Sequence, residues 1–229
     1  PICLPWFGVD FRNKENPNHG FARNVNWQLA GISDADDSQQ GACTRIEFTL
    51  DQYQQQPHAL FSYPFSAKLV FLMGDSLSIQ LQLSNTGSET MPLTWALHSY
   101  HPVADIASAR ISGLDGCEYL DNTSGLKRSI QNGDVEFNGE VDSVYIDAGD
   151  EQSITSTSKN NDGIAITASG CASAVVWNPG EEKAALLKTV GVENRKHFVC
   201  LERGSVCDNE VMLPPNETHS ASLQIKLLS

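Results

Sequence analysis

A strict alternation of apolar and polar residues over residues 76–87 constrains the fold most strongly. Leucine and isoleucine alternate there with serine and glutamine, and the run ends at the turn-forming sequence Asn85-Thr86-Gly87. A period of two places alternate side chains on opposite faces of an extended chain. The stretch therefore predicts a β-strand buried on one face, and the preceding AKLVFLMGDS predicts a second strand and a turn that complete a hairpin. The apolar positions of the alternation are Leu77, Ile79, Leu81 and Leu83.

Further strands are predicted at residues 171–180, 196–206 and 220–229, from the same alternation or from short apolar runs closed by turn residues. No window of about 12 residues keeps a helical apolar spacing without Gly or Pro. Many short strands punctuated by Gly, Pro and Asn favour an all-β fold, an antiparallel β-sandwich or barrel. The polar stretches 33–41 and 150–163 are predicted to be surface loops or hairpin tips, and neither marks a domain boundary. Residues 1–229 are therefore predicted to form a single domain.

Composition excludes several kinds of partner. The formal net charge of −13 repels nucleic acid and anionic membranes, so neither is an expected partner. No apolar run reaches the length of about 18 residues that a membrane-spanning helix requires. The six cysteines form no CxxC pair, and no histidine lies at zinc-finger spacing from them. Their scattered positions favour reduced thiols in a cytoplasmic protein over a disulfide scaffold.

Two residues within predicted strands are candidates for chemistry. His98 lies on the strand face opposite a stripe of Leu93, Trp95 and Leu97, although a surface position would explain such a histidine equally simply. Glu202, in FVCLERGSV, shares a face with Cys200. Glutamate is uncommon in strands, and a covered carboxyl would have a raised pKa suited to a general base. The alternative for Glu202 is an ion pair with a nearby arginine at a strand end.

Two other segments are weaker candidates. His19 and Arg23 lie in HGFAR, directly after a turn-forming sequence, and Asp142 lies in GEVDSVYID. Each of them is also explained as a turn or surface residue. The chain contains no glycine-rich phosphate loop, no GxSxG elbow, no HExxH motif and no metal-ligand cluster of defined spacing. What remains is a histidine and a carboxylate, a pair that can perform acid–base catalysis without a cofactor.

Seven segments in order carry a resemblance to a known family: PICLPWFG, HGFAR, ALHSY, GEVDSVYID, VVWNPG, FVCLERGSV and LPPNE. Together they resemble the aldose 1-epimerase superfamily and, within it, the hexose-6-phosphate mutarotases. The resemblance covers essentially the whole chain. It implies a large antiparallel β-sandwich, the galactose mutarotase-like supersandwich, with the sugar bound in a cleft on one sheet.

The resemblance also implies roles for individual residues. Glu202 would take the proton of the anomeric hydroxyl and His98 would donate a proton to the ring oxygen, with the neighbouring carboxylate raising the histidine pKa. Four further side chains would contribute to the sugar site, namely His19, Arg23, Asp142 and Trp177. The implied reaction is the interconversion of the α and β anomers of a hexose 6-phosphate, without a cofactor or metal, by a cytoplasmic monomer.

Two departures from the family pattern qualify this expectation. A phosphate-binding arginine of the family would precede Pro1, so the domain is expected to lack its N-terminal strands, and Arg23 would carry more of the phosphate binding. His101 stands where the family usually has an aromatic residue. Two alternative functions remain open: a mutarotase of an unphosphorylated aldose such as galactose, and a non-catalytic sugar-binding protein on the same fold.

Overall fold

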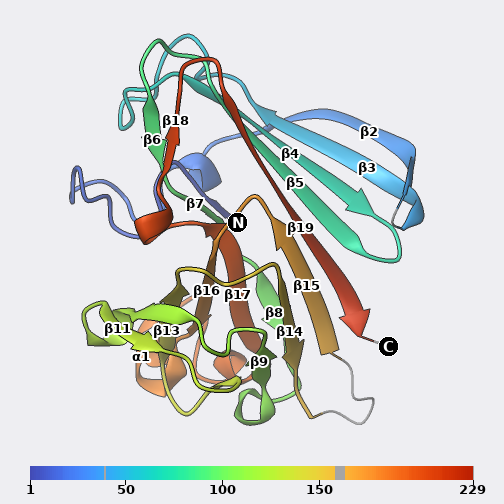
Figure 1. Cartoon of the computed structure of the whole chain (residues 1–229), viewed down its shortest axis with the longest axis vertical. Coiled ribbons are helices and arrows are strands. Elements are labelled where there is room, and N and C mark those ends of the chain that lie inside the picture. Colours follow the sequence, from blue (N-terminus) through green and yellow to red (C-terminus); the bar gives the residue numbers. More distant parts are fainter. Residues whose placement is uncertain (39, 158–162, 229) are drawn as a thin grey trace.

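Two antiparallel β-sheets dominate the computed structural model, which describes residues 1–38, 40–157 and 163–228 (Figure 1). In spatial order, the larger sheet contains β12 (Val135–Glu136), β9 (Arg110–Ser112), β14 (Glu151–Thr155), β15 (Gly163–Ser169), β19 (Thr218–Leu228), β5 (Leu77–Asn85), β4 (Phe65–Met73), β3 (Gly41–Leu50) and β2 (Gln28–Asp37). The smaller sheet contains β1 (Ile2–Cys3), β7 (Trp95–Leu97), β17 (Phe198–Ser205), β16 (Ser173–Asn178), β13 (Val141–Tyr145), β10 (Glu118–Asp121) and β11 (Lys127–Ile130), and β8 (Tyr100–Pro102) also pairs with β17. A separate ribbon pairs β6 (Met91–Leu93) with β18 (Val211–Leu213).

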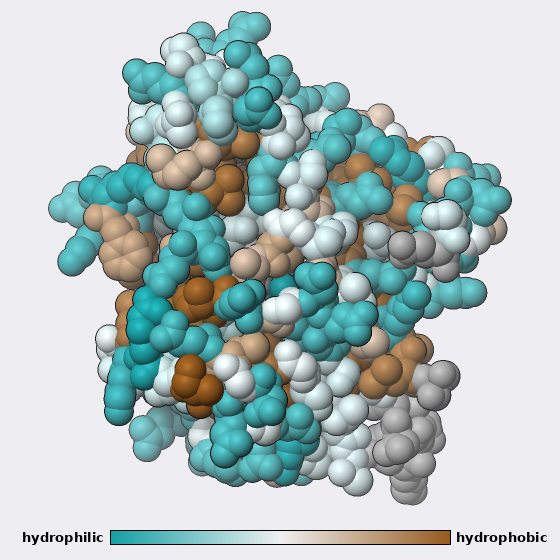
Figure 2. All heavy atoms as spheres, in the orientation of Figure 1, coloured by the Kyte–Doolittle hydropathy of each residue, from teal (hydrophilic) through white to brown (hydrophobic). Residues whose placement is uncertain are grey.

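Helical structure is limited to short segments. The one α-helix among the described residues, α1, spans Gly180–Leu186, and no described helix has the length and apolar character needed to cross a membrane. The 3₁₀ turns are Ala22–Asn24, Ile106–Ser108, Asn122–Ser124, Asn194–His197 and Cys207–Asn209. The all-β, antiparallel sandwich predicted from the sequence is thus confirmed. Figure 2 shows a largely hydrophilic face with small, scattered apolar patches, as expected when apolar side chains are gathered between the sheets.

The hairpin predicted from the alternating stretch is present as β4 and β5, in which Met73 pairs with Leu77 and Phe65 with Asn85. Leu81 and Leu83 are almost fully buried in the core between the sheets. β19 pairs along β5 on one side and β15 on the other, so it joins the two halves of the larger sheet (Figure 1).

Two stretches predicted to be loops are partly strand. Residues 33–37 belong to β2, and residues 151–155 form β14. β2 is the edge strand of its sheet and is mostly exposed, so its polar composition does not conflict with pairing. In β14, Gln152 and Ile154 are the buried positions, and a polar residue in one of them hides the alternation. The expected tip at 158–162 and residue 39 lie outside the described residues.

A buried arginine fixes which face of β17 is turned towards the core. Arg203 is 1% exposed, and its guanidinium donates hydrogen bonds to the carbonyl oxygens of Gly149, Cys171 and Ser173 and to the side chain of Gln152. These acceptors replace the water that a buried guanidinium loses. Because side chains alternate along a strand, the neighbouring Glu202 is directed to the opposite face.

The close approach of β17 and β7 can be tested at Gly204. A Cβ there would lie 2.1 Å from the carbonyl oxygen of Trp95 and 2.7 Å from the Cα of Ala96. We expect Gly204→Ala to lower the free energy of unfolding by about 1–3 kcal/mol, as measured by urea denaturation, because the two strands must separate. Gly31→Ala is the matched control, since no atom lies within 4 Å of a Cβ at that position. Equal losses in the two variants would contradict this interpretation.

Candidate active site

Strand pairing places His98 opposite Glu202. Leu97 pairs with Arg203 and Tyr100 pairs with Cys200, so the residues between them face one another in an unchanged register. The regular ladder is interrupted at this point. The backbone N–H of His98 donates to the carbonyl oxygen of Pro1 (2.8 Å), and the Ser99 hydroxyl donates to that of Leu201 (2.7 Å). The interruption leaves the two functional side chains adjacent without a conventional backbone pair between them.

The core stripe predicted opposite His98 is confirmed. Leu93, Trp95 and Leu97 are all buried in the main core between the sheets. His98 lies on the other face of the smaller sheet and retains 13% side-chain exposure. The alternative of a freely solvated surface histidine is therefore wrong.

His98 and Glu202 form a close, buried pair. The His98 Nδ1 atom lies 3.3 Å from Glu202 Oε1, and the Glu202 side chain is only 2% exposed. Neither His98 Nδ1 nor Glu202 Oε2 has a hydrogen-bond partner among the described residues. Buried polar atoms are nearly always paired, so orphaned ones indicate a place kept for a ligand or a reaction. The alternative ion pair between Glu202 and Arg203 does not form, because Arg203 points into the core.

Burial sets the protonation of this pair. It raises the pKa of Glu202 well above its ordinary value, and the negative charge of Asp142 raises it further. Burial also lowers the pKa of His98 to about 3, with a smaller contribution from His19. The expectation that the carboxylate would raise the histidine pKa is therefore wrong, since burial lowers this pKa and Glu202 is not among the groups that raise it. Burial thus favours the uncharged form of both side chains.

His19 and Arg23 approach the pair from the N-terminal segment. The His19 ring lies 6.2 Å from that of His98, and its Nδ1 accepts a hydrogen bond from the Gly8 N–H (3.2 Å). Burial, followed by the charge of Arg23, lowers the pKa of His19 to about 4. One Nη2–H of Arg23 donates to the carbonyl oxygen of Asn18 (2.8 Å). The structure thus places both residues beside His98.

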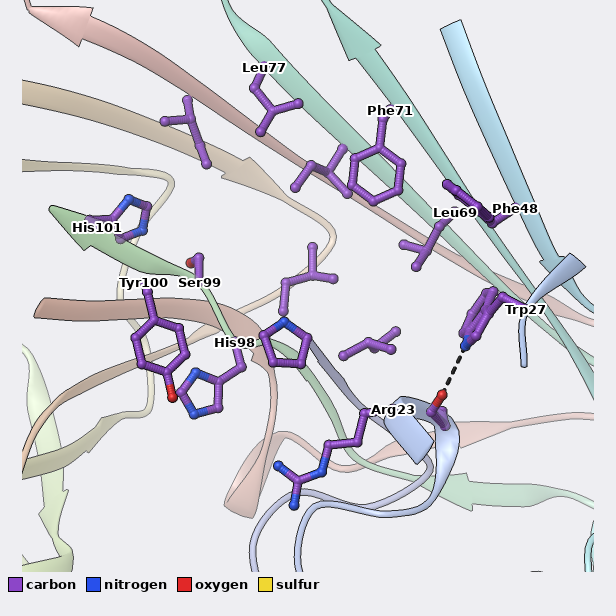
Figure 3. A pocket seen from close by; sticks show the side chains of 16 residues that line it. Arg23, Trp27, Phe48, Leu69, Phe71, Leu77, His98, Ser99, Tyr100 and His101 are labelled. Carbon is purple, nitrogen blue, oxygen red and sulfur yellow. Dashed lines mark hydrogen bonds between the residues drawn. The ribbon is translucent and has the colours of Figure 1, made fainter. Parts of the chain in front are cut away.

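A cavity of about 560 Å³ opens between the sheets next to His98. Figure 3 shows His98, Tyr100 and Arg23 at one end of this cavity, with Phe71 and Leu77 of the larger sheet on its far side. Most of its lining is apolar, and Glu202 and Asp142 are absent from that lining. His98 lines this cavity and also contacts Glu202, so it connects the cavity to the buried carboxyl group.

Trp177 and Asp142 lie on the same face of the smaller sheet as the pair. Trp177 is directly opposite Cys200 on one side and Asp142 on the other, and its ring lies 6.2 Å from that of His98. Asp142 Oδ2 accepts a hydrogen bond from Asn122 (2.9 Å) and lies 3.7 Å from Lys183 Nζ. Asp142 is thus separated from Glu202 by one intervening strand, close enough to act on its pKa.

Tyr100 is a site residue that the sequence analysis missed. Its ring stacks on that of His98, with centroids 4.9 Å apart and planes within 6°. The signal was available, because Tyr100 follows His98 by two residues and so shares its strand face. His101, by contrast, is buried, and its Nε2 lies 3.3 Å from the carbonyl oxygen of Leu201. Its ring therefore has a structural contact of its own.

The sequence model of the aldose 1-epimerase family matches residues 1–226, which cover both halves of this site. The chain belongs to the aldose 1-epimerase family.

Two proteins of similar sequence are named as putative glucose-6-phosphate 1-epimerases. A protein of Cenchrus ciliaris named "Putative glucose-6-phosphate 1-epimerase" is 32% identical over 225 residues, which are 95% of this chain and 66% of the relative. A protein of Escherichia coli K12 with the same name is 30% identical over 223 residues, which are 96% of this chain and 71% of the relative. The chain thus spans about two thirds of the length of the curated relatives that it matches.

Solved structures agree on the fold. A Salmonella typhimurium protein described as a "putative mutarotase (YeaD)" matches with a TM-score of 0.84 at 26% identity, over 100% of this chain and 73% of that chain. A "galactose mutarotase-like protein" from Clostridium acetobutylicum matches with a TM-score of 0.76 at 18% identity, over 100% and 79% of the two chains. The galactose mutarotase-like architecture expected from the family resemblance is confirmed.

The raised pKa of Glu202 predicts a pH-dependent cost to stability. The unfolded chain releases this proton near the ordinary pKa of 4.5, whereas the folded chain retains it. Above that pH, the Glu202 contribution lowers the free energy of unfolding by about 1.4 kcal/mol per pH unit until the folded pKa is reached. Glu202→Gln removes this contribution. We therefore expect the stability of the variant, relative to the unmodified chain, to increase in thermal denaturation as the pH rises above about 5, until the pKa of the folded carboxyl is passed.

The matched control is Glu151→Gln, which alters an exposed strand glutamate. Its stability difference from the unmodified chain should stay nearly constant over the same pH range. A constant difference for Glu202→Gln as well would show that this carboxyl titrates normally in the folded state.

Proposed function

We propose that this family member interconverts the α and β anomers of a hexose 6-phosphate by general acid–base opening of the sugar ring. The observation that carries the proposal is the buried pair of His98 and Glu202, whose Nδ1 and Oε1 atoms lie 3.3 Å apart. His98 Nδ1 and Glu202 Oε2 have no hydrogen-bond partner in the part of the chain that the structure describes. The anomeric oxygen and the ring oxygen of an aldopyranose are bonded to the same carbon, so an acid and a base that act on them must lie only a few ångströms apart. Adjacent groups on one sheet face meet that requirement.

The proposed reaction moves two protons in each direction. Glu202 takes the proton of the C1 hydroxyl, the C1–O5 bond breaks, and His98 donates a proton to O5. The resulting aldehyde rotates about the C1–C2 bond and closes on its other face, and both proton transfers reverse. No proton or electron is gained or lost overall, so the two side chains complete the cycle without a cofactor. General acid–base catalysis of this kind contributes roughly 10²–10⁴-fold in rate.

The directions of the two pKa shifts correspond to one stage of this cycle. After ring opening, Glu202 carries the proton and His98 is neutral, which is the arrangement that burial favours. Before ring opening, the proton is on His98 and the carboxylate is ionised. The hydroxyl groups of a bound sugar supply partners for the orphaned atoms and so favour that ionised form. The energy difference between the two arrangements is thereby reduced, which helps the proton to move in both directions.

Arg23 is the proposed phosphate ligand. It lines the cavity at the end where His98 lies, and a guanidinium can donate two parallel hydrogen bonds to a phosphate. The two relatives that share about a third of this sequence are named for glucose 6-phosphate, which supports a phosphorylated substrate.

Exchange spectroscopy tests the catalytic pair. We expect Glu202→Gln and His98→Asn each to slow the interconversion of α- and β-glucose 6-phosphate by about 10²-fold or more, measured by NMR, because each removes one of the two proton carriers. Glu151→Gln should exchange the anomers at the unmodified rate. Near-normal exchange in either active-site variant would remove that residue from the mechanism, and binding without exchange in the unmodified chain would indicate a sugar-binding protein.

A comparison of substrates tests Arg23. We expect Arg23→Met to raise KM for glucose 6-phosphate by about 10-fold to 100-fold, because a charge-assisted hydrogen bond to the phosphate is lost. The same variant should leave kcat/KM for free galactose nearly unchanged. Arg45→Met, which alters an arginine paired with Glu47 in the larger sheet, is the matched control. Equal losses on both sugars would show that Arg23 supports the fold rather than the phosphate, and a preference for galactose in the unmodified chain would contradict the proposed substrate.

A further inference from the structure

Three metal-ligating atoms converge at the centre of the proposed active site. A ring nitrogen of His98, the Sγ atom of Cys200 and a carboxylate oxygen of Glu202 all lie within 4.8 Å of one another. Cys200 and Glu202 are alternate residues of β17 and so share a face, and the register of β7 and β8 places His98 opposite Glu202. The sequence shows no recognisable ligand spacing, because His98 lies on a different strand from the other two residues.

The spacing of these atoms is close to that of zinc ligands. With zinc–nitrogen and zinc–oxygen bonds of about 2.0–2.2 Å, two ligands of a tetrahedral site lie roughly 3.3–3.6 Å apart. His98 Nδ1 and Glu202 Oε1 are 3.3 Å apart, so this pair already has the required separation. Bringing the cysteine sulfur into coordination from within 4.8 Å requires a shift of about 1.3 Å or less, which a side-chain adjustment supplies.

A second observation points to a ligand at this place. The Glu202 side chain is 98% buried, and its Oε2 atom has no hydrogen-bond partner among the described residues, nor does His98 Nδ1. Such atoms are costly to bury unless something binds them. A divalent cation would satisfy both at once, and Cys200 is itself fully buried beside them.

We propose that His98, Cys200 and Glu202 form an inhibitory site for a single Zn²⁺ ion. The cation would coordinate the imidazole nitrogen, the thiolate and the carboxylate, with the thiol and carboxyl protons released to solvent, and a water molecule would complete the tetrahedron. The mixed nitrogen, sulfur and oxygen ligands favour Zn²⁺ over Mg²⁺ or Ca²⁺, which prefer oxygen alone. Zinc and sugar would exclude one another, because both require His98 and Glu202. The binding follows from the ligand geometry alone, whereas the inhibition rests on the proposed function.

Binding is tested without any activity assay. Titration with Co²⁺, a spectroscopic substitute for zinc, should produce a thiolate-to-metal absorption band in the unmodified chain, and calorimetry should show one Zn²⁺ bound per chain. Cys200→Ser should abolish the band and weaken Zn²⁺ binding by about tenfold or more, because hydroxyl oxygen is a poor ligand for this metal. Cys43→Ser, which alters a buried cysteine of β3 in the larger sheet, should retain both signals. Absence of the band from the unmodified chain, or its persistence in Cys200→Ser, would overturn the site.

Inhibition is tested by the ratio of anomerase rates with and without Zn²⁺ for each variant, so that changes in basal rate cancel. We expect inhibition competitive with sugar, with an inhibition constant about tenfold or more higher in Cys200→Ser than in Cys43→Ser. Equal inhibition of the two variants would show that zinc acts elsewhere. If the unmodified chain has no epimerase activity, the proposed function fails, while the absorption and calorimetric results still decide the metal site.

Discussion

The antiparallel pairing of β17 with β7 and β8 is the constraint on which the proposed site depends. Leu97 pairs with Arg203, and Tyr100 pairs with Cys200. This register brings together His98 and Glu202, which lie about a hundred positions apart in the chain. A slip by one residue would turn Glu202 into the core and Arg203 out of it, because side chains alternate strictly along a strand. The slip is opposed by the four acceptors around the Arg203 guanidinium, which no carboxylate could use. The buried arginine thus determines the position of the catalytic candidate beside it.

On the opposite face of β17, the buried Glu202 lowers the stability of the fold and supplies a group for the proposed chemistry. Glu202 is buried next to a neutral histidine and within reach of the negative field of Asp142, and nothing among the described residues hydrogen-bonds its second oxygen. A site designed for stability alone would fill this position with an apolar residue. The absence of partners keeps the proton available for transfer and leaves room for the hydroxyl groups of a sugar. The aromatic rings of Tyr100 and Trp177 both contact the His98 ring.

The sequence predicts individual strands of this fold better than it predicts which strands pair and which side chains are buried. The alternation over β5 and β19 identifies both strands, since buried positions alternate with more exposed ones along part of each strand. β14 escapes the same reasoning because its inward Gln152 is polar. Its burial is compensated by hydrogen bonds to the carbonyl oxygens of Ala148 and Gly149 and by one from Arg203, a contact between distant segments. His98 and Glu202 can be selected as a pair only through the family resemblance, because no local pattern shows that their strands are neighbours. The direction of the His98 pKa shift also depends on burial, and burial results from packing that the strand's own sequence does not contain.

The unpartnered polar atoms of His98 and Glu202 can bind more than one kind of ligand. The same orphaned nitrogen and oxygen that suit the hydroxyl groups of a pyranose are also suited to a cation, and Cys200 adds the sulfur that makes the cation a transition metal rather than magnesium. An apolar residue of similar size at position 200, opposite Trp177 on the neighbouring strand, would leave only two ligands. Two ligands hold zinc weakly, since structural and catalytic zinc sites use three or four protein side chains. The choice of cysteine at this one position therefore separates a site that accepts only sugar from one in which metal and sugar compete.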